Sequence, residues 1–109
     1  MAGADRIQLG ELLLDGDSQR VFIADEQVSV GPTEFRLLMF FMTHPNRAYT
    51  RGQLLDQVWG NNVYLEEHTI DVHIRRLRKA LQTPSVDCSA YVETVRGTGY
   101  RFCVQSSAT

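Results

Sequence analysis

The residues best suited to bind another molecule lie in the segment 68–81, HTIDVHIRRLRKAL. On a helix of about 100° per residue, one narrow stripe is aliphatic, formed by Ile70, Ile74, Leu77 and Leu81. The opposite side is polar and mostly cationic, formed by His68, Thr69, Arg75, Arg76 and Lys79. Such a side can bind anionic groups. At its centre lies Val72, an aliphatic residue whose position needs an explanation.

The distribution of charge along the chain also favours an anionic partner, although the net charge is -2. Residues 1–70 carry five Lys/Arg and ten Asp/Glu, whereas residues 71–109 carry six Lys/Arg and three Asp/Glu. Cationic charge is therefore concentrated in the last third of the chain. This asymmetry is typical of an anion-binding surface on an otherwise acidic protein.

Length and composition predict one domain over residues 1–109, with an ordered core at about 7–104. The two cysteines, Cys88 and Cys103, form no C-x-x-C motif and have no clustered histidines, which indicates two reduced thiols and no metal site. No apolar run approaches the roughly 20 residues of a membrane span, and no signal peptide follows Met1. We therefore expect a cytoplasmic protein without a membrane partner.

The first half of the chain predicts a sheet and then a buried helix. Short alternating runs between Ile7 and Val30, separated by turn-rich stretches, indicate a small antiparallel sheet. Pro32 suits a first helical position, and residues 35–42 are apolar almost all round. The helix should end at His44, because a residue that precedes a proline avoids the helical region.

Two further helices are expected in the middle of the chain. Thr50 and Gln53 have capping-box spacing, so a second helix should begin at Thr50 and stop at Gly60. The residues that it should bury are Leu54, Leu55, Val58 and Trp59. After a loop, Glu66 and Glu67 favour the start of a third helix, over residues 67–81, because acidic groups stabilise a helix N-terminus.

The end of the chain predicts a hairpin. Two β-rich runs, 91–95 and 100–104, flank the sequence RGTG, whose glycines permit a tight reversal. This places Arg96 at the tip. Three helices followed by such a hairpin form a helix-turn-helix variant with a β wing.

A DNA major groove would explain the exposed position of Val72. Cations can meet phosphates and base acceptors there, while an aliphatic group can contact a thymine methyl. The alternative is that Val72 packs against the same protein or is an ordinary surface aliphatic. Likewise, Asp71 and Arg75 could form only a helix-stabilising pair. A second cationic site on the same side, Arg96, favours DNA because a wing arginine can enter a minor groove.

The stretches GPTEFRLL, TRGQLLDQVWG, TIDVHIRRLRKAL and TVRGTGYRF, in this order and spacing, resemble the DNA-binding effector domain of OmpR-family two-component response regulators. The resemblance extends from Ile7 to Phe102 and is strongest to members that control phosphate-starvation genes. It implies an α+β winged helix with an N-terminal four-stranded antiparallel sheet, three helices and a C-terminal β-hairpin wing. It also implies head-to-tail dimers on direct repeats in double-stranded DNA. The receiver domain, through which a sensor kinase would act, is absent from this chain.

The resemblance further implies a role for individual residues, with the third helix in the major groove. The residues expected to face base edges are Asp71, Val72, His73 and Arg76. The residues expected near phosphates are His68, Thr69, Arg75, Arg78, Lys79, Thr94 and Thr98. Arg96 corresponds to the wing arginine that enters the minor groove.

The loop before the third helix resembles the family's contact with the sigma subunit of RNA polymerase. The residues expected at this contact are Trp59, Gly60, Leu65, Glu66 and Glu67. The acidic pair beside an apolar side chain could meet a basic helix. The alternative is an ordinary connection, in which Trp59 packs into the core and the glutamates only favour the helix terminus.

The chain departs from the family at two places. His68 stands where relatives often have arginine, and histidine is mostly uncharged near pH 7. We therefore expect a weaker and more pH-sensitive phosphate contact at the start of the third helix. The loop before Tyr91 is also longer than usual in the family.

Other function classes have less support. The sequence contains no phosphate-binding glycine loop, no arrangement typical of an activated nucleophile and no cofactor motif, so we expect no enzyme. His68 and His73 are five residues apart, on different sides of their helix, which argues against a shared metal. The remaining alternatives are a winged helix that binds an acidic protein through its cationic side, or a regulator of a different regulon.

Overall fold

The computed structural model describes residues 6–60 and 68–104. The chain begins with a four-stranded antiparallel sheet of β1 (Arg6–Leu9), β2 (Leu12–Asp15), β3 (Arg20–Ile23) and β4 (Glu26–Val28), in that order. One face of the central strands packs into the core through Leu12, Leu14, Val21 and Ile23, each at most 1% exposed. The sheet predicted between Ile7 and Val30 is confirmed.

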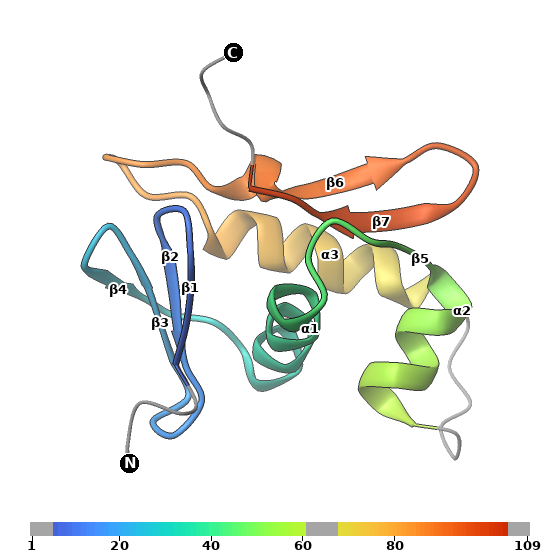
Figure 1. The fold of residues 1–109 in the computed structure, drawn as a ribbon, viewed down its shortest axis with the longest axis horizontal. Coiled ribbons are helices and arrows are strands. Elements are labelled where there is room, and N and C mark those ends of the chain that lie inside the picture. The colour runs from blue at the N-terminus through green and yellow to red at the C-terminus, as the bar shows by residue number, and fades with distance from the viewer. Residues whose placement is uncertain (1–5, 61–67, 105–109) are drawn as a thin grey trace.

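The helix α1 (Pro32–Thr43) follows the sheet and lies in the middle of the domain (Figure 1). Pro32 occupies the first turn, and the helix ends before Pro45 as predicted. Its buried apolar residues are Phe35, Leu37, Leu38, Phe41 and Met42. Phe41 stacks on Phe102 of the last strand, so α1 joins the N-terminal sheet to the C-terminal part of the core.

The second helical segment begins at the predicted capping box. The Thr50 hydroxyl accepts a hydrogen bond from the backbone amide of Gln53 at 3.0 Å. The Gln53 side-chain oxygen accepts one from the backbone amide of Thr50 at 2.8 Å. The segment consists of α2 (Arg51–Leu54) and a π-helical turn, η2 (Leu55–Trp59), and it ends at Gly60 as predicted. Leu54 and Val58 are buried, whereas Leu55 and Trp59 are only half-buried.

The third helix, α3 (Thr69–Ala80), turns its aliphatic stripe fully into the core. Ile70, Ile74, Leu77 and Leu81 are at most 1% exposed, which confirms the predicted apolar side. The helix starts with His68 at the N-cap position. The earlier start predicted at Glu66 and Glu67 lies outside the described residues.

A short helical turn, η3 (Ser89–Tyr91), leads into the hairpin of β6 (Val92–Val95) and β7 (Gly99–Phe102). The predicted hairpin is confirmed, but it belongs to a three-stranded sheet in the order β5-β7-β6. The added strand, β5 (Ala48–Thr50), was not predicted, because three residues are too short for a periodic pattern. Figure 1 shows the hairpin running along α3, with its tip at the end where α3 begins. The whole arrangement is a winged helix.

The connection from α3 to the hairpin is ordered by its own hydrogen bonds. The Thr83 hydroxyl donates to the Val86 carbonyl and accepts from the Val86 amide. Cys88 is buried, its amide donates to the Leu81 carbonyl, and both Cys88 and Cys103 are free thiols, as predicted. The longer loop therefore still anchors the start of the hairpin against the end of α3.

Candidate nucleic-acid interface

The solvent side of α3 carries the predicted mixture of cations and one aliphatic group. Val72 is 42% exposed and is the most exposed large hydrophobic side chain among residues 6–60 and 68–104. Arg75, Arg76 and Lys79 are exposed on the same helix, and His68 is exposed at its start. Val72 does not pack into the core, so its exposure fits either a contact with DNA or an ordinary surface aliphatic, and the DNA contact stays a prediction.

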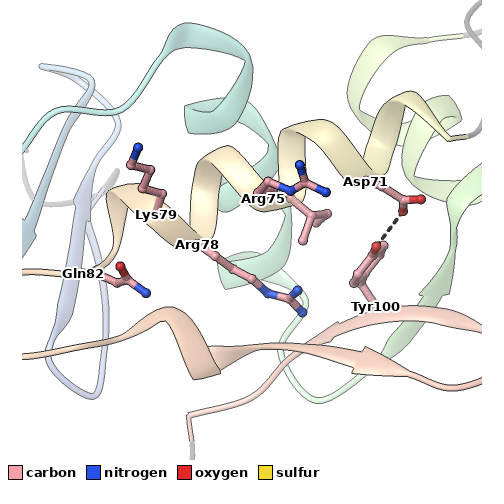
Figure 2. A pocket seen from close by; sticks show the side chains of 7 residues that line it. Asp71, Arg75, Arg78, Lys79, Gln82 and Tyr100 are labelled. Atoms are coloured by element: carbon pink, nitrogen blue, oxygen red, sulfur yellow. Dashed lines mark hydrogen bonds between the residues drawn. The ribbon is translucent and has the colours of Figure 1, made fainter.

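A hollow of about 350 Å³ separates α3 from the wing (Figure 2). The residues that line it are Asp71, Ile74, Arg75, Arg78, Lys79, Gln82 and Tyr100. Three of these side chains are cationic and one is anionic. The hollow is therefore an electropositive groove between the two parts of the molecule that would each approach a nucleic acid.

Arg78 spans this groove and holds the wing. Its Nε and Nη2 atoms donate to the Val92 carbonyl at 3.0 and 2.7 Å, and Nη2 also donates to the Thr94 hydroxyl at 2.9 Å. Figure 2 shows the side chain reaching from α3 toward the hairpin. The predicted phosphate contacts of Arg78 and Thr94 would therefore come from groups that already bind each other.

Asp71, predicted to face bases, belongs to a network within the protein. Its Oδ1 atom accepts from the Arg51 Nε at 2.8 Å and from the Tyr100 hydroxyl at 2.6 Å. Both bonds end on the same oxygen, so the network uses one of the two carboxylate oxygens. The Tyr100 bond, together with Arg51, holds the pKa of Asp71 below its ordinary value. Burial and the bond to Asp71 raise the pKa of the Tyr100 hydroxyl.

Asp71 should make stability depend on pH. A carboxylate whose pKa is lowered by folding stabilises the fold above its unfolded pKa, about 4, and this contribution is lost as pH falls through the folded pKa. Asp71→Asn should therefore be less stable than the parent protein at pH 7, by a difference that shrinks below pH 4. Urea unfolding of both proteins from pH 7 to pH 2 measures this, and the other carboxylates cancel in the difference. A difference that stays constant down to pH 2 would contradict the prediction.

His73 turns toward the protein and not toward solvent. Its Nδ1 atom lies 2.6 Å from the Glu34 Oε2 atom of α1, and the two side chains are only 16% and 9% exposed. The Trp59 ring packs against the imidazole, with 5.2 Å between ring centroids. Glu34 and Trp59 already contact this imidazole. The predicted base contact of His73 would have to come from the remaining edge of the ring.

The wing presents its predicted tip to solvent. Arg96 and Thr98 are exposed, and the Thr98 amide donates to the Val95 carbonyl at 3.0 Å to close the turn. Gly97 has φ 79°, a conformation that glycine adopts without strain. Thr69, predicted near a phosphate, lies half-buried in the first turn of α3.

The predicted polymerase contact is only partly described. Trp59 is half-buried against His73, and Gly60 is exposed at the end of η2. Leu65, Glu66 and Glu67 lie outside the described residues. The packing of Trp59 supports the alternative of a structural role for this ring, while the contact itself stays a prediction.

Sequence reasoning did not identify Arg51, Tyr100 and Glu34 as partners of α3. It expected Asp71 and His73 at base edges and Arg78 near phosphates, and it predicted no partners for them within the protein. At about 100° per residue, these three lie within about 90° of the centre of the apolar stripe, on its borders. Arg75, Arg76 and Lys79 lie farther round the helix. Angular distance from the stripe was therefore the signal that could have separated the two groups.

Two kinds of feature are absent from residues 6–60 and 68–104. No helix there is long and apolar enough to cross a membrane. No group of His, Cys, Asp and Glu there is placed to hold a metal ion.

Comparison with known proteins decides the family. The sequence model of a protein family described as "Transcriptional regulatory protein, C terminal" matches residues 25–102. The chain is 64% identical over 100 residues to the phosphate regulon transcriptional regulatory protein PhoB of Pseudomonas aeruginosa, covering 92% of this chain and 42% of that protein. It is 58% identical over 102 residues to PhoB of Escherichia coli K12, covering 94% of this chain and 44% of that protein.

This chain belongs to the OmpR/PhoB family of DNA-binding transcriptional regulators. It spans less than half the length of these two PhoB relatives. The resemblance to this family and the winged-helix fold, both expected from the sequence motifs, are confirmed.

Solved OmpR/PhoB-family domains have the same fold. The DNA-binding domain of the response regulator AdeR, solved in complex with an intercistronic region, superposes with a TM-score of 0.78 at 28% identity and covers 90% of this chain and 99% of that one. The Klebsiella pneumoniae RstA DNA-binding domain, in complex with the RstA box, gives a TM-score of 0.75 at 29% identity and covers 90% of this chain and 96% of that one.

Proposed function

We propose that this domain regulates transcription by binding direct repeats in double-stranded DNA, with α3 in the major groove and the wing in the adjacent minor groove. The observation that carries the proposal is Val72, exposed among Arg75, Arg76 and Lys79 on the solvent side of α3. Cations can meet phosphates and base acceptors, and the aliphatic group can meet a thymine methyl. Arg96 at the exposed wing tip supplies a second cation for the minor groove.

The target genes are proposed from the relatives. The relatives at 64% and 58% identity are named as regulators of the phosphate regulon. We assign this domain to phosphate-starvation promoters, where it acts as an activator in the cytoplasm. As part of a two-component system, it would bind as a head-to-tail dimer, under the control of a receiver domain and its sensor kinase.

The test is a fluorescence anisotropy titration of the domain against a duplex with two phosphate-box-like direct repeats and against a scrambled duplex, each at two salt concentrations. Tighter binding to the repeats supports the proposal. Equal binding to both duplexes contradicts it and favours the alternatives, namely repeats of another regulon or an acidic protein partner. Salt dependence by itself does not separate these, because both kinds of complex are electrostatic.

Two neighbouring arginines should respond differently in the same assay. Arg75→Ala should weaken binding to both duplexes about equally and reduce the salt slope by about 1, because a phosphate contact carries no sequence information. Arg76→Ala should weaken binding mainly to the repeats, by a factor equivalent to about 1 to 3 kcal/mol. Identical profiles for the two variants would contradict this assignment.

Activation is proposed to use the sigma subunit of RNA polymerase, through Trp59, Gly60, Leu65, Glu66 and Glu67. Replacement of Glu66 and Glu67 by Lys should reduce transcription from a repeat-containing promoter in vitro, because a basic partner would be repelled. DNA affinity measured by anisotropy should not fall, because the added lysines cannot repel phosphates. Unchanged transcription would contradict the sigma contact.

A further inference from the structure

The base of the wing is fixed by the pairing of β7 with β5. Gly99 pairs with Thr50 in the three-stranded sheet, and a Cβ atom at Gly99 would lie 2.2 Å from the Tyr49 carbonyl oxygen. The first residue of β7 therefore passes β5 at a distance that only glycine allows. This contact fixes the strand in the sheet, but it does not set its orientation toward α3.

Tyr100, the next residue, faces α3. It is 5% exposed, it pairs with Tyr49 on β5 and with Thr94 on β6, and its hydroxyl donates to Asp71 Oδ1 at 2.6 Å. Figure 2 shows the ring rising from the hairpin toward the first turns of α3. One phenol thus joins the middle strand of the wing sheet to the helix that we propose reads the major groove.

Two arginines, Arg51 of α2 and Arg78 of α3, also contact Tyr100. Together with Asp71 and Tyr100 they form the joint between α3 and the wing. The Arg51 guanidinium comes from α2, donates to the same Asp71 oxygen at 2.8 Å and lies 5.5 Å from the centre of the Tyr100 ring. The Arg78 guanidinium lies 5.6 Å from that ring and holds β6 through Val92 and Thr94. The ring is therefore shared by two cation–π contacts and one charge-assisted hydrogen bond.

The tip of the wing depends on this joint. Residues 96–98 are exposed, and the turn is closed within the hairpin by the bond from Thr98 to Val95. The position of Arg96 relative to α3 is therefore transmitted through β6 and β7. Contact with two adjacent grooves at once requires a fixed offset between helix and wing, to within about half an ångström for a well-formed site.

We propose that the Tyr100 hydroxyl and Asp71, supported by Arg51 and Arg78, position the wing so that Arg96 can enter the minor groove while α3 occupies the major groove. The proposal rests on the DNA-binding function proposed above. Tyr100 is a positioning residue that acts through Arg96. The network also occupies Arg51 and Arg78 inside the protein, and it leaves Arg75, Arg76 and Arg96 for DNA.

A double-mutant cycle with Tyr100→Phe and Arg96→Ala tests the proposal by anisotropy on the repeat duplex. Tyr100→Phe keeps the ring and its cation–π contacts but removes the hydroxyl. In the parent protein, Arg96→Ala should weaken binding about tenfold, the effect of losing one specific contact. In the Tyr100→Phe protein, the same change should cost less than about threefold, because the wing is no longer in place. A purely structural hydroxyl would lower the melting temperature and leave the cost of Arg96→Ala unchanged, and this result would overturn the proposal.

Two controls separate positioning from folding. Arg76→Ala should cost the same in the parent and in Tyr100→Phe, because α3 stays in the major groove; this also shows that the variant is folded in the assay. Tyr49→Phe removes the hydroxyl of the neighbouring strand residue, which pairs with Tyr100 on β5, and should leave the cost of Arg96→Ala at its parental value. A similarly reduced cost of Arg96→Ala in Tyr49→Phe would overturn a specific role for Tyr100.

Failure of the proposed function and failure of the positioning proposal give different results. If the parent domain binds the repeat and scrambled duplexes equally, sequence-specific binding fails, and wing positioning fails with it. If the parent discriminates between the duplexes and Arg96→Ala costs the same in both backgrounds, only the positioning proposal fails. If Arg96→Ala costs nothing in the parent, the proposed minor-groove contact of the wing fails together with the positioning proposal, and sequence-specific binding through α3 stands.

Discussion

Val72→Asp is expected to reduce binding to the direct-repeat duplex by about 100-fold. The new carboxylate would lie among Arg75, Arg76 and Lys79, where it would neutralise cations, repel phosphates and remove the proposed contact with a thymine methyl. Together these losses correspond to about 3 kcal/mol, and 1.4 kcal/mol is a factor of ten in affinity. Anisotropy titration of parent and variant at one salt concentration measures the change.

A conservative variant separates the two causes. Val72→Ala removes most of the aliphatic contact without adding charge, so binding to the repeats should weaken by about tenfold or less. Because Val72 is 42% exposed, both variants should melt within a few degrees of the parent. If Val72→Asp binds the repeats as tightly as the parent does, α3 does not read DNA through this side.

Gly99→Ala is expected to destabilise the domain by about 3 kcal/mol, because the added Cβ would meet the Tyr49 carbonyl oxygen at 2.2 Å. Neither group can move freely, since the carbonyl is a backbone atom, the Cβ is fixed directly to the backbone, and the two strands are paired. For a domain of this size, the melting temperature should fall by roughly 10 to 20 °C. Differential scanning calorimetry measures both the temperature and the enthalpy of unfolding.

Gly97→Ala is the matched control in the same hairpin. A Cβ atom there meets nothing within 4 Å, but φ is 79°. The expected cost is therefore only that of the left-handed conformation, about 1 kcal/mol. Equal destabilisation by the two variants would show that glycine's conformational freedom matters in this hairpin, and not the close approach of β7 to β5.

Most of the fold could be predicted because its helices and strands follow from sequence patterns that span only a few residues. The stripe of Ile70, Ile74, Leu77 and Leu81 predicts the buried side of α3, and Thr50 with Gln53 predicts the start of the second helical segment. The hairpin follows from two β-rich runs around RGTG. Strand β5 could not be found in this way, because its three residues acquire strand structure only by pairing with β7.

The candidate interface was predicted less completely. Periodicity identified Val72, Arg75, Arg76 and Lys79 as exposed, because these residues lie far from the apolar stripe. It did not resolve residues on the borders of the stripe, where a polar side chain can face either solvent or a neighbouring element. Whether such a residue finds a partner depends on what packs beside the helix.

By itself, the sequence determined the N-terminal sheet, the three helical segments, the final hairpin, the buried side of α3 and the concentration of cations on its exposed side, because these depend on spacing of a few residues along the chain. Only the tertiary structure decided that Asp71 binds Arg51 and Tyr100, that His73 binds Glu34 and that Arg78 holds the wing. These partners are 14 to 39 residues apart in the chain. Packing of the sheets around α1 and α3 brings these partners together. A sequence pattern of a few residues cannot predict contacts between residues so far apart in the chain.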